Sequence, residues 1–363
     1  MELKGKRVIV AMSGGVDSSL TAALLKDKGC EVIGVTLKLF DYERDECDVR
    51  KKSCCSTEDV YDARRVAEKI DIPFYVLDYK DLFKEYVIDN FVTEYLKGRT
   101  PNPCIICNEK IKFHYMLKQA EKLDADFLAT GHYAINEYDE DAKLFRLKKG
   151  VDDNKDQSYF LFNLTQEQLK KIIFPLGGFT KDHVRELAKK YALKVADKVD
   201  SQEICFVTNN DYQSFIEKEV SKDTLRPGNI VNTSGNVLGP HKGIFAYTIG
   251  QRKGLGISHP TPLYVLGFDR EKNEVIVGSD KELFKTEIEL DNVTFISMDA
   301  PESELKVNVK IRYSHRSSAA TLIMTGKDKA RVTFSEPQRA ITPGQAAVFY
   351  SDDEVVGGGW IER

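Results

Sequence analysis

The 363-residue sequence contains no apolar run that approaches the roughly 18 residues of a membrane-spanning helix. It has no internal repeat and no low-complexity tract. Met1 leads almost directly into an apolar segment that reads as a strand, so no signal peptide fits and we expect a cytoplasmic protein without a membrane partner. The content of 42% hydrophobic and 30% charged residues is typical of a soluble globular chain of two or three domains.

An excess of basic residues is also lacking, because the net charge is −4. A nucleic acid could therefore bind only through a local basic patch. Seven cysteines are present without a secretory signal, which indicates a reducing compartment. In that setting cysteines act more often as ligands or nucleophiles than as disulfide partners.

One glycine-rich stretch organises the N-terminal part of the chain. Ala11 to Ser19 lies between an apolar run, 6–11, and a segment rich in Ala and Leu, 20–28. Strand, Gly/Ser turn and helix in this order direct backbone N–H groups and a helix N-terminus at an anion. The lysine that would follow the glycines of a Walker sequence is absent. Ser-Gly-Gly-x-Asp-Ser resembles instead the PP-loop of the ATP pyrophosphatases, which cleave ATP between its α- and β-phosphates.

Alternating elements follow this stretch and predict a doubly wound parallel sheet of the α/β class. Strands are expected at 31–37, 73–77 and 127–130, and helices at 57–70 (capped by Ser56), 82–96 and 109–123. The charged stretch 41–52 reads as an exposed loop. Since ligands bind at the carboxyl ends of parallel strands, we expect 13–19, Leu37 and Gly131-His132 to surround one crevice.

The predicted secondary structure changes from helical to mainly β near residue 209. Helical patterns at 166–171 and 181–191 give way to short strands separated by Gly, Pro, Asn and Asp, at 228–231, 264–267, 274–277, 330–334 and 346–350. Alternation places Val307, Val309, Ile311 and Tyr313 toward a core. We predict three domains: 1–208, a small central domain at 209–284, and a β-rich domain at 285–363.

A Cys-x-x-Cys pair, Cys104 and Cys107, follows a loop stiffened by prolines and precedes the predicted helix at 109–123. Near a helix N-terminus the dipole favours the thiolate. The pair alone fits half a zinc site, a redox pair, part of an iron–sulfur site or buried structural thiols. A third cysteine, Cys205, lies in a short segment that reads as a strand. We interpret Cys54 and Cys55 as spectators and Cys30 as packed in the interior.

Several motifs in order resemble one family. They are Ser13-Gly14-Gly15-Val16-Asp17-Ser18, Thr100-Pro101-Asn102-Pro103, Cys107-Asn108, Thr130-Gly131-His132-Tyr133, Lys155 to Phe160, Ile204-Cys205-Phe206, Gly250 to Gly256, Arg312-Tyr313 and Pro343-Gly344-Gln345. Together they resemble the tRNA-specific 2-thiouridylases across essentially the whole chain. The resemblance implies a PP-loop (adenine nucleotide alpha hydrolase-like) domain, a small central domain and a C-terminal β-barrel. It also implies a tRNA-uridine 2-sulfurtransferase, which uses ATP and Mg²⁺ to thiolate C2 of the wobble uridine.

The resemblance further implies roles for individual residues. Cys205 would carry a persulfide, Cys107 would be the assisting nucleophile that forms a disulfide when sulfur is released, and Asp17 would be needed for adenylylation. The ATP contacts would be Ala11, Met12, Ser13, Gly14, Gly15, Val16, Asp17, Ser18, Leu37 and Gly131. The contacts to the tRNA anticodon stem-loop would be Asn102, Pro103 and Cys104 at the target base, with His132, Lys155, Asp156, Gln157, Arg312, Tyr313 and Gln345 elsewhere. The stretch 306–316 has two Lys, two Arg and no acid, which suits phosphate contacts.

The sequence departs from the family at Cys104, where many members carry Asp. Cys104, Cys107 and Cys205 could therefore bind three irons of a 4Fe-4S cluster and leave the fourth open to sulfide. We weigh this cluster hypothesis slightly above the persulfide hypothesis. The sulfur donor would be a desulfurase, a sulfur-relay protein or free sulfide, and we expect a monomer. Two other classes stay open: a PP-loop ligase acting on a small molecule, and a tRNA-binding protein without catalysis, which would need neither Asp17 nor the cysteines.

Overall fold

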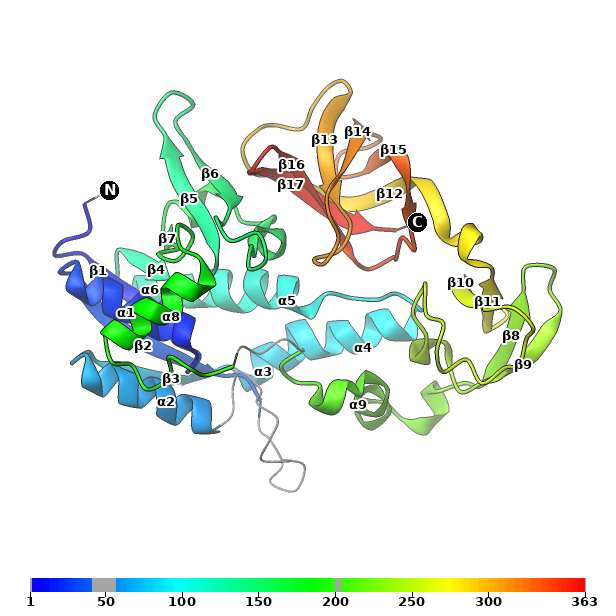
Figure 1. Ribbon diagram of the computed structural model, residues 1–363, viewed down its shortest axis with the longest axis horizontal. Helices are drawn as coiled ribbons and strands as arrows, with labels where there is room; N and C mark the ends of the chain where they lie inside the picture. Colours follow the sequence, from blue (N-terminus) through cyan, green and yellow to red (C-terminus); the bar gives the residue numbers. More distant parts are fainter. Residues whose placement is uncertain (1, 41–56, 200–203, 363) are drawn as a thin grey trace. The chain divides into compact units, whose positions relative to one another are not determined.

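The computed structural model describes residues 2–40, 57–199 and 204–362, and the chain forms two compact units (Figure 1). Unit 1 comprises Met1–Val87, Cys104–Asn210 and Asp353–Val355. Unit 2 comprises Ile88–Pro103, Asp211–Asp352 and Val356–Arg363. Each unit is therefore assembled from segments that are distant in the sequence.

A parallel sheet forms the centre of unit 1. Its strand order is β3-β2-β1-β4-β7, and each neighbouring pair is parallel. The strands are β1 (Arg7–Ala11), β2 (Glu31–Lys38), β3 (Phe74–Asp78), β4 (Phe127–Ala129) and β7 (Ile172–Ile173). Val8 and Val10 of β1 are buried on one face and Ile9 on the other, as a strand covered on both faces requires.

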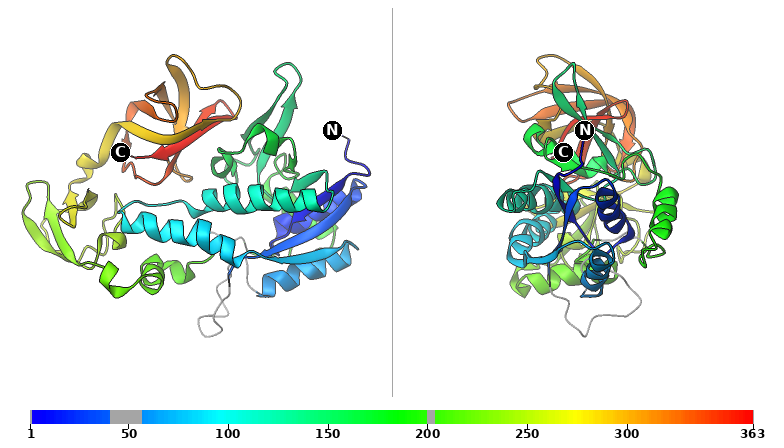
Figure 2. Two further views of the ribbon diagram at one scale, coloured as in Figure 1. Left: turned by 180° about the vertical axis from the view of Figure 1, so that it is seen from behind. Right: turned by 90° about the vertical axis from the view of Figure 1, so that its left-hand side faces the viewer.

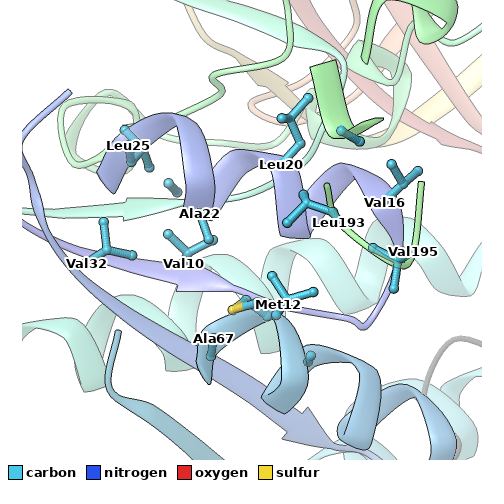
Figure 3. Close-up of a cluster of buried hydrophobic side chains, with 14 of the residues drawn as sticks. Val10, Met12, Val16, Leu20, Ala22, Leu25, Val32, Ala67, Leu193 and Val195 are labelled. Carbon is cyan, nitrogen blue, oxygen red and sulfur yellow. The ribbon is translucent and has the colours of Figure 1, made fainter. Parts of the chain in front are cut away.

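Helices cover both faces of this sheet (Figure 2). One face packs on α1 (Val16–Asp27) and α2 (Thr57–Lys69), α8 (Lys181–Lys190) packs on α1, and α6 (Met116–Lys122) packs on β4. In Figure 3, Val10 and Val32 face the α1 side chains, and Met12 lies beside Ala67 of α2. The predicted doubly wound α/β sheet is confirmed. The predicted cap Ser56, the loop 41–52, Cys54 and Cys55 lie outside the described residues.

The helix that carries the Cys-x-x-Cys pair begins earlier than the sequence suggested. It consists of α5 (Pro103–Ile106), a π-helical stretch η2 (Cys107–Tyr115) and α6. Pro103 opens the helix and Asn102 precedes it, a combination that suits an N-terminus. The expected start at Glu109 is wrong, because the prolines that read as a loop initiate the helix. A second π-helical stretch, η1 (Lys84–Ile88), joins α3 (Lys80–Phe83) to α4 (Asp89–Leu96).

Unit 1 also contains a hairpin that the sequence pattern did not reveal, formed by β5 (Ala134–Asp139) and β6 (Leu144–Lys149). The short helix α7 (Gln166–Leu169) that follows lies within the predicted helical pattern at 166–171. The segment with Cys205 is a turn that leads into a 3-10 helix at Thr208–Asn210, so the expected strand there is wrong. Its apolar residues are anchored by tertiary packing, since the Phe206 ring meets the Phe83 ring at 5.6 Å.

Unit 2 contains a small mixed sheet of order β10-β11-β8-β9. Its strands are β8 (Gly228–Asn232), β9 (Val237–His241), β10 (Tyr264–Asp269) and β11 (Glu274–Gly278). Helix α4 belongs to this unit together with α9 (Tyr212–Glu219). Aromatic contacts join the two helices: Tyr95 stacks on Tyr212 at 4.7 Å, and Phe91 meets Phe215 at 6.2 Å.

The C-terminal strands of unit 2 close into a barrel, which confirms the predicted β-barrel. Their order is β12-β15-β14-β13-β16-β17, and β12 also pairs with β17. The strands are β12 (Phe284–Phe295), β13 (Leu305–Lys310), β14 (Ser318–Met324), β15 (Ala330–Arg339), β16 (Ala346–Ser351) and β17 (Glu354–Ile361). Val307, Val309 and Ile311 are buried as expected, but β13 ends at Lys310 and Tyr313 is 37% exposed. The expected core position of Tyr313 is therefore wrong.

Candidate active site

The glycine-rich turn between β1 and α1 has the backbone geometry of an anion-binding loop. Gly14 has a φ of 76°, a left-handed conformation that favours glycine, and Gly15 is the N-cap of α1. The Ser18 hydroxyl accepts a hydrogen bond from the Ser13 N–H at 3.1 Å. The Ser19 hydroxyl donates to the Gly15 carbonyl at 2.8 Å. These bonds fix the turn locally while the start of α1 keeps its N-terminal dipole.

Two glycines allow other backbone segments to approach this loop closely. A Cβ atom on Gly14 would overlap the carbonyl group of Asp59 in α2, with its carbonyl carbon at 2.7 Å. A Cβ atom on Gly131, just after β4, would lie 2.9 Å from both the Asp17 carbonyl carbon and the Ser18 nitrogen. Gly131 and the loop therefore meet at the carboxyl edge of the sheet, where the sequence predicted a crevice.

The Asp17 carboxylate lies at the start of α1 and has two side-chain partners from other elements. Lys181 donates through Nζ to Oδ1 at 2.9 Å and Oδ2 at 2.8 Å, and the Tyr133 hydroxyl donates to Oδ1 at 2.7 Å. Lys181 and Tyr133 are buried, whereas the Asp17 side chain is 29% exposed. The carboxylate is thus held firmly and still faces outward.

A second lysine, Lys198, is partly buried and contacts the loop. Lys198 donates through Nζ to the Gly14 carbonyl at 3.0 Å and to Asp59 and Asp62 of α2, each at 2.6 Å. Burial lowers the pKa of Lys198, but the two carboxylates outweigh burial and leave that pKa above its ordinary value. The ammonium therefore stays charged and links the loop to α2.

Several residues expected at the tRNA turn inward in this structure. Asp156 is buried and accepts hydrogen bonds from the Gly150 and Ser158 N–H groups at 3.2 and 3.0 Å. Gln157 pairs with Tyr133, accepting through Oε1 from the Tyr133 N–H at 3.0 Å and donating its own N–H to the Tyr133 carbonyl at 2.9 Å. This motif braces Tyr133 and, through it, Asp17.

His132 is also buried, and its ring packs near those of Phe113 and Phe174. Its Nδ1 lies 2.7 Å from the Thr130 hydroxyl. Burial lowers the pKa of His132 well below its ordinary value, and Lys112 lowers it further. A neutral imidazole in this position orders the segment after β4. Lys155, by contrast, is partly exposed.

The three cysteines of interest all belong to unit 1. Cys104 is exposed, Cys107 is buried and Cys205 is intermediate. Because the helix begins at Pro103, the N-terminal dipole acts mainly on Cys104, and Cys107 lies one turn deeper than the sequence indicated. Helix α3 packs on η2, which carries Cys107, and its Phe83 contacts Phe206, the neighbour of Cys205. The two thiols therefore share one supporting element.

Comparisons with known proteins agree over the whole chain. Residues 6–209 match the family model described as the tRNA methyl transferase HUP domain, 213–279 its PRC-barrel domain, and 285–361 the aminomethyltransferase beta-barrel domain. The sequence is 54% identical over 362 residues to the tRNA-specific 2-thiouridylase MnmA of Geotalea uraniireducens, covering 99% of this chain and 96% of that protein. The chain belongs to the tRNA-specific 2-thiouridylase family.

Two further members of the 2-thiouridylase family give similar values. MnmA 1 of Thermoanaerobacter pseudethanolicus is 56% identical over 361 residues, covering 99% of both chains, and MnmA of Clostridioides difficile is 51% identical over 358 residues, covering 99% of this chain and 98% of that protein. The resemblance inferred from the motifs is confirmed. Full-length membership disfavours the small-molecule ligase, one of the two alternatives that the sequence left open.

The iron–sulfur hypothesis for this 2-thiouridylase is not supported. Among residues 2–40, 57–199 and 204–362, no group of three or more His, Cys, Asp or Glu side chains is arranged to hold a metal ion. Cys104, Cys107 and Cys205 thus do not form the ligand set that a cluster would need. The same described ranges contain no helix that is both long and apolar enough to cross a membrane.

In the barrel unit, the residues expected at the tRNA differ in their surroundings. Tyr313 is exposed, and Lys310 lies 5.2 Å from the centre of its ring. The Arg312 guanidinium donates to the Ala340 carbonyl and the Thr342 hydroxyl. These hydrogen bonds tie the segment after β13 to the segment after β15 within the barrel. Gln345 donates through Nε2 to the Thr100 carbonyl at 2.8 Å. It therefore supports the segment that leads to Asn102 and Pro103.

Sequence reasoning missed Lys181 and Lys198 as parts of the site and gave Tyr133 no role. Tyr133 stood in a recognised motif, but its partner Asp17 is more than a hundred residues away. Lys181 offered one local signal, because a lysine in the first position of a helix opposes the helix dipole. No local pattern pointed to Lys198.

Proposed function

We propose that this protein thiolates C2 of the wobble uridine of tRNA at the expense of ATP. The observation that carries the proposal is that unit 1 combines a glycine-rich loop at the N-terminus of α1, Ser13 to Ser18, with the buried Cys107 and the partly exposed Cys205. A small-molecule ligase needs the loop but not the thiols. A tRNA-binding protein without catalysis needs neither.

The loop would activate the uridine. Backbone N–H groups at the start of α1 suit the phosphates of ATP, and Ala11, Met12, Gly15, Val16, Leu37 and Gly131 would complete its surroundings. The C2 oxygen attacks the α-phosphorus, the bond to the β-phosphate breaks, and pyrophosphate leaves. C2 then carries AMP, which is a far better leaving group than the original oxygen.

Mg²⁺ fits this site through Asp17, because carboxylate and phosphate oxygens are the ligands it prefers and the Asp17 carboxylate is 29% exposed. When bound, Mg²⁺ would shield the phosphate charge. Lys181 and Tyr133 hold the carboxylate in place for this task.

Sulfur would arrive as a persulfide on Cys205, delivered by a desulfurase or a sulfur-relay protein. The terminal sulfur attacks C2 and expels AMP, leaving the uridine joined to Cys205 through a sulfur–sulfur bond. The Cys107 thiolate then attacks the Cys205 sulfur, which releases 2-thiouridine and leaves a Cys107–Cys205 disulfide. An external dithiol reduces that disulfide. Because the described cysteines do not form a cluster ligand set, this route fits the structure better than one through 4Fe-4S.

The tRNA would be bound by several parts of the chain acting as a monomer. Asn102, Pro103 and Cys104 would meet the base after it leaves the anticodon stack. Lys155 and the barrel residues Lys310, Tyr313 and Gln345 would contact the RNA elsewhere, while His132, Asp156, Gln157 and Arg312 would support these contacts from within. We propose a catalytic region at 1–208, a central region at 209–284 and a barrel region at 285–363.

The test follows the two products of the first step. Purified protein is incubated with labelled ATP and Mg²⁺, with or without an unmodified tRNA transcript, and AMP and pyrophosphate are measured. We expect both products only with tRNA, and 2-thiouridine in the digested tRNA once a persulfide donor is added. Products formed with a small amino-containing acceptor instead of tRNA would favour the ligase. Full thiolation by iron-free protein would decide for the persulfide over the cluster.

A further inference from the structure

Lys181 occupies a position that neither helix stability nor solvation explains. It is the first residue of α8, where a cation opposes the helix dipole, and its side chain is only 8% exposed. A buried ammonium is costly unless it is paired and hydrogen-bonded. We therefore expect the buried Lys181 ammonium to act on the groups that it contacts.

The contacts of Lys181 converge on Asp17. The ammonium donates to both carboxylate oxygens, and it lies 5.7 Å from the centre of the Tyr133 ring, whose hydroxyl donates to the same carboxylate. Lys181 and Tyr133 are themselves held by hydrogen bonds to other residues. The Lys181 N–H donates to the Asp152 carboxylate at 2.9 Å, and Gln157 holds the backbone of Tyr133.

The ion pair between Lys181 and Asp17 sets the net charge at the start of α1. Without a cation, the Asp17 carboxylate would bring a negative charge to the place where phosphates are expected, and it would be drawn toward the N–H groups of its own helix. Lys181 and Tyr133 neutralise the carboxylate and pull it aside, so the N–H groups remain available to an anion.

We propose that Lys181 is a positioning residue for the ATP loop, which compensates the charge of Asp17 and holds its carboxylate away from the phosphate-binding N–H groups. The inference rests on the proposed function, since it requires that ATP binds at Ser13 to Ser18. A purely structural alternative is that the ion pair only joins α8 to α1, whose apolar faces already pack together in the core around Leu193 and Val195 (Figure 3).

Binding of ATP in the presence of a metal chelator separates the two roles, because it measures the charge at the loop without Mg²⁺ or tRNA. By titration calorimetry we expect Lys181→Met to weaken ATP binding by about tenfold or more. The double variant Asp17→Asn/Lys181→Met should recover most of that loss, because it removes the uncompensated carboxylate. Lys189→Met is the matched control, since this lysine of the same helix is 60% exposed. It should leave ATP binding unchanged.

Each outcome has a distinct meaning. If the unchanged protein binds no ATP with the chelator or with Mg²⁺, the proposed function fails. If it binds ATP only with Mg²⁺, Lys181 does not keep the N–H groups available to an anion, and the positioning role fails. If it binds ATP and Lys181→Met binds equally well, the positioning role fails. If the double variant binds as weakly as Lys181→Met, charge compensation is wrong and the pair is only a brace. Thermal unfolding of each variant establishes that it is folded, and Lys181→Gln replaces Lys181→Met under the same criteria if the latter does not fold.

Discussion

Cys104 and Cys107 lie three residues apart on one helix and have different surroundings, since Cys104 is exposed and Cys107 is buried. A buried thiol such as that of Cys107 can react only with a group brought close to it, whereas the exposed Cys104 thiol at the helix start meets solvent. The persulfide route therefore requires the thiol of Cys107 but not that of Cys104.

The first prediction follows from that difference. Cys104→Ser should change thiolation by no more than roughly twofold, as expected for an exposed position, while Cys107→Ser and Cys205→Ser should lower it by at least about a hundredfold. Thiolation is measured by mass spectrometry of digested tRNA with a persulfide donor, and iron is counted in each preparation. Loss of both iron and activity in Cys104→Ser would revive the cluster hypothesis.

The second prediction concerns the buried His132. Because its folded pKa lies well below the ordinary value, the folded state excludes a proton that the unfolded state binds below about pH 6.5. Its contribution to stability is therefore present above pH 6.5 and is lost as the pH falls. Urea unfolding between pH 7.5 and 5.5 should show a steeper loss for the unchanged protein than for His132→Gln, by up to about 1.4 kcal/mol per pH unit. If the free energy of unfolding fell equally with pH in the unchanged protein and in His132→Gln, the prediction for His132 would be contradicted.

At the scale of elements, the turn between β1 and α1 contains two adjacent glycines with different constraints. Gly14 has a left-handed backbone and no room for a Cβ atom against Asp59. Gly15 has a φ of −89°, and a Cβ atom there would meet only the Ser13 hydroxyl at 3.6 Å. Gly14 is thus required by the fold, whereas the absence of a side chain at Gly15 leaves open space at the start of α1.

The third prediction uses this pair. Gly14→Ala should destabilise unit 1 by more than about 1–2 kcal/mol, the cost of a left-handed alanine alone, because α2 must also shift. Gly15→Ala should cost less than about 1 kcal/mol in stability and should act on ATP binding instead. Urea unfolding and ATP titration of both variants check this. Equal stabilities would show that α2 does not pack on Gly14.

Elements also show where prediction from the sequence succeeds. The buried strand at 6–11 and the Gly/Ser turn were predictable because apolar runs and glycine chemistry act locally. The helix at Pro103 was placed too late, since proline favours both loops and helix starts, and packing decides between them. The turn at Cys205 was predicted as a strand because its apolar residues are buried by tertiary contacts with Phe83. Lys181 and Lys198 could not be placed, because their partners are over a hundred residues away.

At the scale of the whole molecule, nucleic-acid binding must rely on local charge, because the net charge is −4. The barrel supplies such a region on β13 and the segment after it, where Lys306 and Tyr313 are exposed and Lys310 lies over the Tyr313 ring. Arg312 is committed to the Ala340 and Thr342 oxygens, so its removal would disturb the barrel itself.

The fourth prediction therefore separates Lys310 from Arg312. Lys310→Ala should weaken tRNA binding and reduce the slope of log affinity against log salt by roughly 0.7–1 unit. Arg312→Ala should lower the melting temperature as well. Lys327→Ala, an exposed position in the turn between β14 and β15, is the control. Filter binding at several salt concentrations gives the slopes, and an unchanged slope for Lys310→Ala would remove β13 from the RNA-binding surface.

The hydrogen bonds that Gln345 donates to Thr100 and the ion pair of Arg99 with Glu362 have a consequence for synthesis on the ribosome. Residues 99–101 are translated early, but their partners emerge only after some 240 further residues, on the order of tens of seconds later. Until then the segment that leads to Asn102 and Pro103 lacks its support. A truncated product that already contains the glycine-rich loop and all the cysteines would therefore still lack these contacts, so the early and late segments of unit 2 become joined only when the chain is complete.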